Sequence, residues 1–571
     1  MLNKRLIMNK ITIYIAIVFM GFSDLGIIAQ TPKSPLSRVI NVSGTTQIAP
    51  SLSGDGKHMI FTTTDNLKRE LLVFYSYQQR PGKWTQPQPV TAVNRSQKIN
   101  HLGGYSLSYN GNYIYFTSRK TYGIGKYDIW YSKRTGNNKW STPTNLGRPV
   151  NSAQDDGCPS LSPDGKTLYF VRCQSMNQKE GSDCQLMMVK RRNQDYWGEP
   201  EALPDHINDG NILSPRILAD NQTLLYAKGQ GDSWDLYQTR RTVNGWTQPV
   251  ALDYLNTAGD ERFASVPAQG DVIYYSTKFK GTYDIIKARI PEEFQPLKVV
   301  YLKGKVVDRQ GLPLEAFIQI YDVEDKSLAQ YHRTKQNDSG FEFYVPAGKK
   351  YDFSVVPLTP NYTFYSEIFD LCELTVSIRK KLDIELENLD KGITFPLQCL
   401  QFENDSTLSN TSRLEMSRLI KLLKNNPGTQ IEIAVHRDSW ETDSVLQVDT
   451  TLVQVDTTLV QVDTTLVQVD TTLVQVDTTL AQVDTTLFEE LFITESSLQA
   501  IDSLQIPQDI PAKPKLDPTE IQAQAISRYL QERGVPDYLL EPKGYADSQP
   551  VAVNDTEEQR ILNRRVEIRI L

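Results

Sequence analysis

Histidine is scarce in this chain, and the motifs of common hydrolases are absent. The five histidines among 571 residues stand singly, at positions 58, 101, 206, 332 and 436, so they lack the clustered spacing of a zinc site. The sequence contains no Gly-x-Ser-x-Gly nucleophile elbow and no His-Glu-x-x-His motif. We therefore expect no metal, no cofactor and no enzymatic activity.

Long apolar runs are absent except at the N-terminus. Three basic residues precede the apolar residues 11–20, and small and polar residues follow. This is the pattern of a secretory signal peptide over residues 1–29, with cleavage after Ala29. A membrane anchor is the alternative, but the apolar run is short for a span and Asp24 interrupts it.

Cysteine is limited to five residues, an odd number, so at least one lacks an intrachain partner. Export would permit disulfides. Cys173 and Cys184 flank a predicted turn and are candidates for a bridge between neighbouring strands. We expect Cys158, Cys372 and Cys399 to be buried thiols.

Basic residues are missing from a segment near the C-terminus. Between Glu441 and Ala512 there are 13 acidic residues and no Lys or Arg, and this segment accounts for the net charge of −7. Six copies of Gln-Val-Asp-Thr-Thr-Leu recur there every seven residues, from Gln447 to Leu487. The spacing is that of a coiled-coil seam, whereas Thr and Val favour strands. We expect a weakly structured acidic insertion over 441–518, and no binding to nucleic acid.

A unit of about fifty residues recurs between residues 36 and 292, a period typical of propellers. Each copy contains a version of Pro-Ser-Leu-Ser-x-Asp-Gly-Lys, whose Asp-Gly indicates a tight turn between two strands. Most copies continue with Trp-x-x-Pro and then an apolar residue followed by Asn. The copies begin at Pro50, Tyr105, Pro159, Pro215 and Val266.

The motif counts indicate how the ring closes. There are five strand pairs but four Trp-x-x-Pro motifs, and the N-terminal Val39-Ile40-Asn41 is an unattached copy of the apolar-Asn element. We predict that this piece completes the last blade and removes the open sheet edge. Five blades are predicted, with six as the alternative. The repeats resemble the PD40 units of TolB-like propellers.

Residues 300–388 show short alternating strands with Gly and Pro turns, which favours a β-sandwich. The stretch 301–313 ends in Arg-Gln-Gly-Leu-Pro, and Asn337-Asp-Ser-Gly-Phe follows later. This pattern resembles the carboxypeptidase regulatory-like domain, which implies an immunoglobulin-like, non-catalytic spacer.

Residues 391–571 contain Ile431-Glu-Ile-Ala-Val-His-Arg-Asp438, a helical run over 519–533, Gly544-Tyr545 and the terminal Asn563-Arg-Arg. These segments resemble the OmpA C-terminal domain, an α/β periplasmic module that binds peptidoglycan. The resemblance implies that a carboxylate pairs with the ammonium of the diaminopimelate side chain, while a guanidinium binds its carboxylate.

The residues of that site carry over only in part. Asp438 matches the family acid, and Asn563 and Arg564 match the terminal motif, but the family's helix arginine is Gln522 here. Glutamine brings no charge, so we expect weaker binding. Arg437, which stands where the family has Thr, is a candidate replacement. The alternative for Asp438 is a solvated loop acid.

The predicted fold is therefore multidomain: an all-β propeller, a β-sandwich, and an α/β OmpA-like domain with a long low-complexity insertion. This order resembles the wall-bound components of type IX secretion and gliding machinery. We expect a scaffold at the periplasmic face of the outer membrane that binds peptidoglycan and, through its propeller, an envelope protein. The alternatives are an adaptor that no longer binds peptidoglycan, and a propeller hydrolase.

Overall fold

The computed structural model describes residues 32–65, 70–95, 104–176, 181–192, 196–230, 233–279, 281–404, 406–438 and 517–571. The predicted signal peptide and the predicted insertion up to residue 516 lie outside these ranges. The chain forms two compact units, Met1–Pro296 and Leu297–Leu571. No helix in the described part is both long and apolar enough to cross a membrane.

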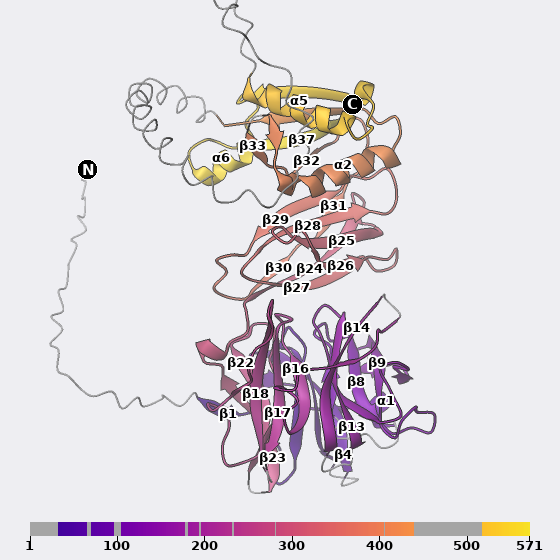
Figure 1. Ribbon diagram of the computed structural model, residues 1–571, viewed down its shortest axis with the longest axis vertical. Helices are drawn as coiled ribbons and strands as arrows, with labels where there is room; N and C mark the ends of the chain where they lie inside the picture. The colour runs from indigo at the N-terminus through magenta and orange to yellow at the C-terminus, as the bar shows by residue number, and fades with distance from the viewer. Residues whose placement is uncertain are drawn as a thin grey trace, which may run out of the picture. The chain divides into compact units, whose positions relative to one another are not determined.

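The first unit is a five-bladed propeller (Figure 1). The first blade contains β2 (Gln47–Leu52), β3 (His58–Asp65), β4 (Glu70–Arg80), β5 (Lys83–Trp84) and β6 (Gln88–Pro89), and the second contains β7 (Tyr105–Leu107), β8 (Tyr113–Ser118), β9 (Asp128–Gly136), β10 (Lys139–Trp140) and β11 (Thr144–Asn145). The third contains β12 (Asp155–Leu161), β13 (Thr167–Met176), β14 (Gly181–Lys190) and β15 (Glu201–Ala202), and the fourth contains β16 (Asn211–Ile217), β17 (Thr223–Gln230), β18 (Ser233–Thr242), β19 (Gly245–Trp246) and β20 (Val250–Ala251). The fifth contains β21 (Glu261–Ser265), β22 (Val272–Phe279), β23 (Thr282–Arg289) and β1 (Lys33–Pro35). The inner strands β2, β7, β12, β16 and β21 lie next to one another in that order, and β21 contacts β2. Two short helices, α1 (Thr91–Asn94) and η1 (Glu292–Phe294), complete the unit.

The N-terminal residues complete the fifth blade, as the motif count predicts. β1 pairs antiparallel with β23. The Asn41 side chain donates a hydrogen bond to the Ile285 carbonyl oxygen at 2.9 Å and accepts one from the Ile285 N–H at 3.1 Å. The same pair of bonds joins Asn94 to Val73, Asn151 to Ile129, Asn208 to Leu186 and Asn256 to Leu236. The ring therefore closes with a contact that all five blades share.

We predict that Asn41→Ala destabilises the propeller by about 1–3 kcal/mol, because it leaves two polar groups of the buried residue Ile285 without their partner. Urea unfolding followed by tryptophan fluorescence measures this, since six of the seven tryptophans belong to the propeller. Asn94→Ala is the matched control inside an unbroken blade and should have a similar effect. If Asn94→Ala destabilises the propeller and Asn41→Ala does not, closure of the ring through the N-terminus would be contradicted.

The Ser-x-Asp-Gly motif forms a turn, and its carboxylate takes part in that turn. In the third blade Asp164 accepts hydrogen bonds from the Ser162 hydroxyl and from the Lys166 N–H at 3.0 Å. The equivalent residues Ser53 and Asp55 make the same contact in the first blade. The sequence interpretation of this motif as turn chemistry agrees with these contacts.

The fifth repeat begins two residues earlier than predicted. One residue of each inner-strand region has a positive φ, and these five residues mark equivalent positions: Ala49, Gly104, Cys158, Ser214 and Phe263. The fifth repeat therefore starts at Ala264 rather than at Val266. Its sequence, Ala-Ser-Val-Pro, lacks the Asp-Gly turn that marks the clearest copies.

The structure joins the sulfur atoms of Cys173 and Cys184, which face each other on β13 and β14. Cys158 and Cys399 are buried thiols. Cys372 is exposed, so the expectation of a buried thiol is wrong there. It lies two residues after Asp370 in a surface turn, where its N–H donates to the Asp370 side chain at 3.2 Å.

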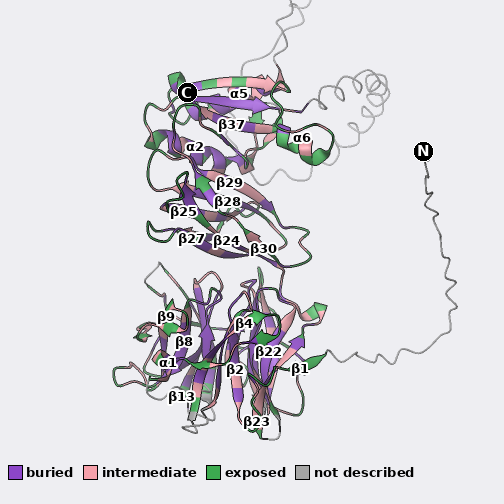
Figure 2. Cartoon of the chain, turned by 180° about the vertical axis from the view of Figure 1, so that it is seen from behind, coloured by how far each residue is buried: buried purple, intermediate pink, exposed green. Residues whose placement is uncertain are grey.

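The second unit begins with two four-stranded sheets that enclose one core. One sheet contains β24 (Val299–Asp308), β27 (Gly340–Pro346), β30 (Ile378–Lys381) and β31 (Ile384–Leu386); the other contains β25 (Ala316–Asp322), β26 (Leu328–Arg333), β28 (Lys350–Pro357) and β29 (Tyr365–Asp370). Buried residues of both sheets, among them Leu302, Ile318 and Phe353, form this core. Five consecutive residues of β28 are buried, and Figure 2 draws buried residues in purple.

The C-terminal part adds an α/β layer. Its sheet has the order β32 (Thr394–Pro396), β37 (Arg565–Ile570), β35 (Ile431–His436) and β36 (Leu540–Ala546), and its helices are α2 (Arg413–Asn425), α5 (Pro518–Gln531) and α6 (Glu557–Asn563). Short elements are β33 (Phe402–Asn404), β34 (Thr407–Leu408), η2 (Asn410–Ser412) and η4 (Asp537–Leu539). Leucines of α2, apolar residues of α5 and inward residues of the sheet share one core. The predicted helical run over 519–533 is present as α5, with its ends shifted by one and two residues.

A buried ionic cluster joins β28 of the two-sheet part to α2 of the α/β part. Arg418 donates to Glu415 at 2.6 Å and also to Asp352, and Ser366 donates to Glu415 at 2.6 Å. The core of the α/β part also includes Phe364, from the segment just before β29. The two predicted domains of this region therefore pack into one compact unit.

Candidate functional site

Asp438 lies two residues beyond β35, the strand between β36 and β37, and is fully buried. Its Oδ2 atom accepts a hydrogen bond from Arg564 Nε at 3.1 Å, and Arg560 Nε lies 3.9 Å from the same oxygen. Its Oδ1 atom is buried and has no hydrogen-bond partner among the described residues. A buried carboxylate oxygen without a donor is costly, so Asp438 is the residue on which a candidate site can be based.

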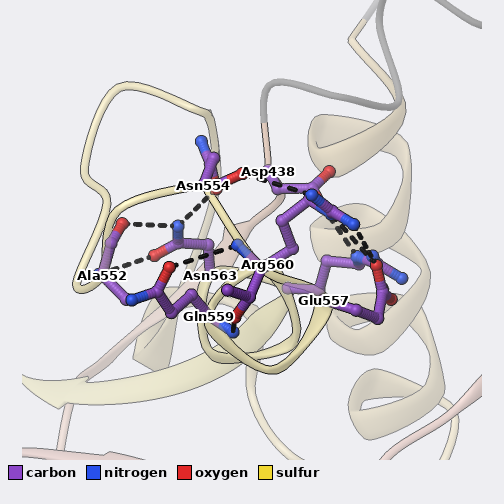
Figure 3. Close-up of polar contacts among 9 residues, drawn as sticks. Asp438, Ala552, Asn554, Glu557, Gln559, Arg560 and Asn563 are labelled. Carbon is purple, nitrogen blue, oxygen red and sulfur yellow. Dashed lines mark hydrogen bonds and ion pairs between the residues drawn. The ribbon is translucent and has the colours of Figure 1, made fainter. Parts of the chain in front are cut away.

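Glu557 forms ion pairs with both arginines, and Figure 3 shows it beside Arg560. Its carboxylate lies 2.7 Å from Arg564 Nη2 and 2.9 Å from Arg560 Nη2. Hydrogen bonds from Arg560 and Arg564 hold the pKa of Glu557 below its ordinary value. Two carboxylates and two guanidiniums thus form one neutral cluster, and Arg564 already has an acidic partner on each side.

The side chain of Asn563 forms hydrogen bonds within the chain. Its Oδ1 accepts from the N–H groups of Val551 and Ala552 at 2.8 and 3.1 Å, and its Nδ2 donates to the Ala552 carbonyl oxygen and to Asn554 Oδ1 at 2.8 and 2.7 Å. The residue is fully buried. These four hydrogen bonds hold the loop before α6, and the predicted contact of Asn563 with a ligand stays a prediction.

Gln522 lies on α5 and is half-buried. The structure gives its side chain no hydrogen bond within the described part of the chain. Arg437 was the candidate to replace the helix arginine, but its side chain has another partner. It forms an ion pair of 2.8 Å with Asp517, whose side chain caps the start of α5.

The Arg437–Asp517 pair also joins the two ends of the described chain beside the insertion, because Asp438 is the last described residue before it and Asp517 the first after it. The start of α5 is held further by β36. Glu520 accepts from the Gly544 N–H at 2.7 Å, and a Cβ on Gly544 would lie 2.3 Å from the Glu520 nitrogen. Close packing of backbone against backbone thus explains the glycine of the Gly-Tyr motif.

Sequence reasoning missed Glu557, Arg560 and the helix that carries them. A signal was present, because Thr556-Glu-Glu-Gln559 matches a capping box, and the structure shows that box at the start of α6. The spacing of Glu557, Arg560 and Arg564 places all three on one side of a helical segment.

A cleft of the second unit is lined by none of the residues of this cluster. It has a volume of about 250 Å³ and is lined by Leu408, Arg413, Arg528, Tyr529 and neighbouring residues, without Asp438 or Arg564. Within the described ranges, no group of three or more His, Cys, Asp or Glu side chains could hold a metal ion. We base the candidate site on Asp438 because of its unpaired buried oxygen, not on cleft size.

No protein-family model matches the chain, and no curated protein matches it. Solved structures do match. A putative TolB from Agrobacterium tumefaciens is 14% identical, with 53% of this chain and 91% of that chain covered and a TM-score of 0.26. An endo-arabinase from Bacteroides thetaiotaomicron is 16% identical, with 44% and 97% covered and a TM-score of 0.32.

The periplasmic domain of Helicobacter pylori MotB is 16% identical, with 38% of this chain and 78% of that chain covered and a TM-score of 0.16. All three identities and TM-scores are low, so these likenesses carry no argument. The names include both a TolB and an endo-arabinase, and they do not decide whether this propeller is catalytic. The five-bladed ring is seen directly in the structure of this chain.

Proposed function

We propose that this protein is a non-enzymatic scaffold of the cell envelope. Its C-terminal α/β part binds peptidoglycan, and its propeller binds an envelope protein at the periplasmic face of the outer membrane. The resemblance to the OmpA C-terminal domain supports the first role. The order of the three predicted parts, which resembles wall-bound components of secretion and gliding machinery, supports the second.

The observation that carries the proposal is the buried, unpaired Oδ1 atom of Asp438. An ammonium group donates strong hydrogen bonds to a carboxylate. The free ammonium of a diaminopimelate side chain is such a donor. Arg564, fixed against the same carboxylate at 3.1 Å, is positioned to bind the carboxylate of the same zwitterion.

A second candidate function is an adaptor that no longer binds peptidoglycan. Two observations favour it. Glu557 already occupies Arg564, and Gln522 brings no positive charge to α5. A ligand carboxylate would have to displace Glu557 from Arg564 or share the guanidinium with it.

Sedimentation with insoluble, diaminopimelate-containing peptidoglycan separates the two functions. We expect the mature chain, residues 30–571, to pellet with the wall material and to be released by free meso-diaminopimelate. A chain that stays in the supernatant would favour the adaptor.

The variant Glu557→Gln sharpens this test. We expect it to bind peptidoglycan more tightly, by up to about fivefold, because it frees the guanidinium from an exposed ion pair of modest strength. Asp390→Asn, an exposed acid of the same unit, is the control for a lost charge and should bind as wild type does. Weaker binding of Glu557→Gln would show that Glu557 itself serves the ligand.

A further inference from the structure

The propeller channel contains a ring of serines that one blade interrupts. Two positions after each positive-φ residue, blades one, two, three and five carry a serine, namely Ser51, Ser106, Ser160 and Ser265. The fourth blade carries Arg216 at this position. Three of the hydroxyls accept a hydrogen bond from the next blade. Ser51 accepts from Leu107, Ser160 from Ile217 and Ser265 from Leu52, at 2.8, 3.1 and 3.0 Å. These three bonds join neighbouring blades, whereas Ser106 makes no such bond and Arg216 replaces the serine of the fourth blade.

Arg216 is a buried cation, with 4% of its surface exposed. Its guanidinium donates to Ser51 Oγ at 3.3 Å and to the Leu52 carbonyl oxygen at 3.0 Å, both in the first blade, and lies 5.2 Å from the centre of the Tyr109 ring. Its Nε atom has no hydrogen-bond partner. Among the described residues it forms no ion pair with a carboxylate.

A small cavity adjoins this group. It has a volume of about 30 Å³ and is lined by residues of all five blades, including Ser51, Ser106, Cys158 and Arg216. The Ser106 hydroxyl is buried and has no hydrogen-bond partner. The Cys158 thiol is neutral, because burial raises its pKa to about 12. The lining thus offers a guanidinium and a free hydroxyl without an acidic side chain.

We propose that the channel binds a small inorganic monoanion of the size of chloride against Arg216 and Ser106. A buried cation without a counter-charge is strongly unfavourable. An anion would neutralise the positive charge of Arg216, whereas a water molecule would only solvate it in part. The volume suits one water-sized or chloride-sized occupant. The anion would replace the missing fourth serine by linking blades across the channel.

The test compares melting of the mature chain, followed by tryptophan fluorescence, in sodium chloride and in sodium gluconate at the same ionic strength of about 0.15 M. Gluconate is too large for the cavity. We expect chloride at ten times its dissociation constant to raise Tm by about 3–6 °C, with saturation at higher concentration. Arg216→Ser, which restores the residue of the other four blades, should melt identically in both salts.

The outcomes separate binding from general salt effects. The proposal would be overturned if the wild-type Tm rises linearly with chloride concentration, or if it is equal in both salts. Arg216 would then only fill the channel, without binding an anion. An equal chloride effect in Arg216→Ser would overturn it as well. If Arg216→Ser does not fold, the wild-type curve decides alone, because a specific site saturates. The proposal is independent of peptidoglycan binding.

Discussion

Arg418→Met is expected to destabilise the second unit by about 3–5 kcal/mol, the range for removing one partner from a buried ionic cluster. Arg418 is 7% exposed, and it compensates two carboxylates, Glu415 and Asp352, that are 0% and 2% exposed. Without the guanidinium both acids would be buried without a counter-charge. Urea unfolding of residues 297–571, followed by circular dichroism, measures the loss. Arg413→Met, an exposed arginine at the start of α2, is the control and should change stability by about 0.5 kcal/mol at most.

The loss of stability caused by Arg418→Met should also depend on pH. Burial raises the pKa of both Asp352 and Glu415, although Arg418 opposes the shift. The folded state then binds more protons than the unfolded state between the ordinary carboxyl pKa and the raised value, so stability falls as pH rises through that window. Arg418→Met removes the opposing charge and steepens this fall. A destabilisation that does not shrink as pH is lowered from about 8 to about 5 would contradict uncompensated carboxyls as its cause.

Asp438→Asn is expected to weaken peptidoglycan binding about tenfold to a hundredfold, which corresponds to losing a charge-assisted hydrogen bond of about 1.5–3 kcal/mol. Asparagine keeps the size of the side chain, so no cavity forms. It removes the negative charge that would pair with an ammonium, and its amide nitrogen cannot accept a hydrogen bond. Sedimentation over a range of peptidoglycan concentrations gives the ratio of affinities.

Circular dichroism must show that this variant is folded, because Asp438 also pairs with Arg564. Asp390→Asn again serves as the control for charge. The double variant Asp438→Asn, Glu557→Gln adds a further arm. If Asp438 holds the ammonium and Glu557 only competes for Arg564, the second change should recover part of the lost affinity. Unaltered binding by Asp438→Asn would place the wall contact elsewhere on the chain.

The propeller could be predicted largely from the sequence because its contacts repeat. Most blades carry a version of the same turn motif and all five use the same apolar-Asn element, so the unattached copy at Asn41 indicated where the ring closes. The fifth repeat was misplaced by two residues, since Ala264-Ser-Val-Pro lacks the turn residues that mark the others. The break at Arg216 was not noticed, because its meaning depends on facing residues of the first blade that are more than 160 positions away.

The candidate site could be predicted only in part. Asp438 and Arg564 are brought together across 126 positions, as the resemblance implied. Glu557 and Arg560 were missed, because a short exposed helix leaves little trace in hydrophobic periodicity. Asn563 was assigned to the ligand, but its four hydrogen bonds are all made to the loop before α6. No sequence pattern distinguishes an amide that faces a ligand from one that faces its own backbone.

By itself, the sequence determined the local features of this protein. Blade repeats, turns, strand alternation and helix periods follow from short-range chemistry, which neighbouring residues decide between themselves. Only the tertiary structure decided which charges are compensated. Arg418 meets two acids of distant segments, Arg564 meets Asp438 and Glu557, and Arg216 meets no acid in the described chain. The physical reason is that the electrostatic state of a buried group depends on partners that folding brings close, and sequence separation says nothing about that distance.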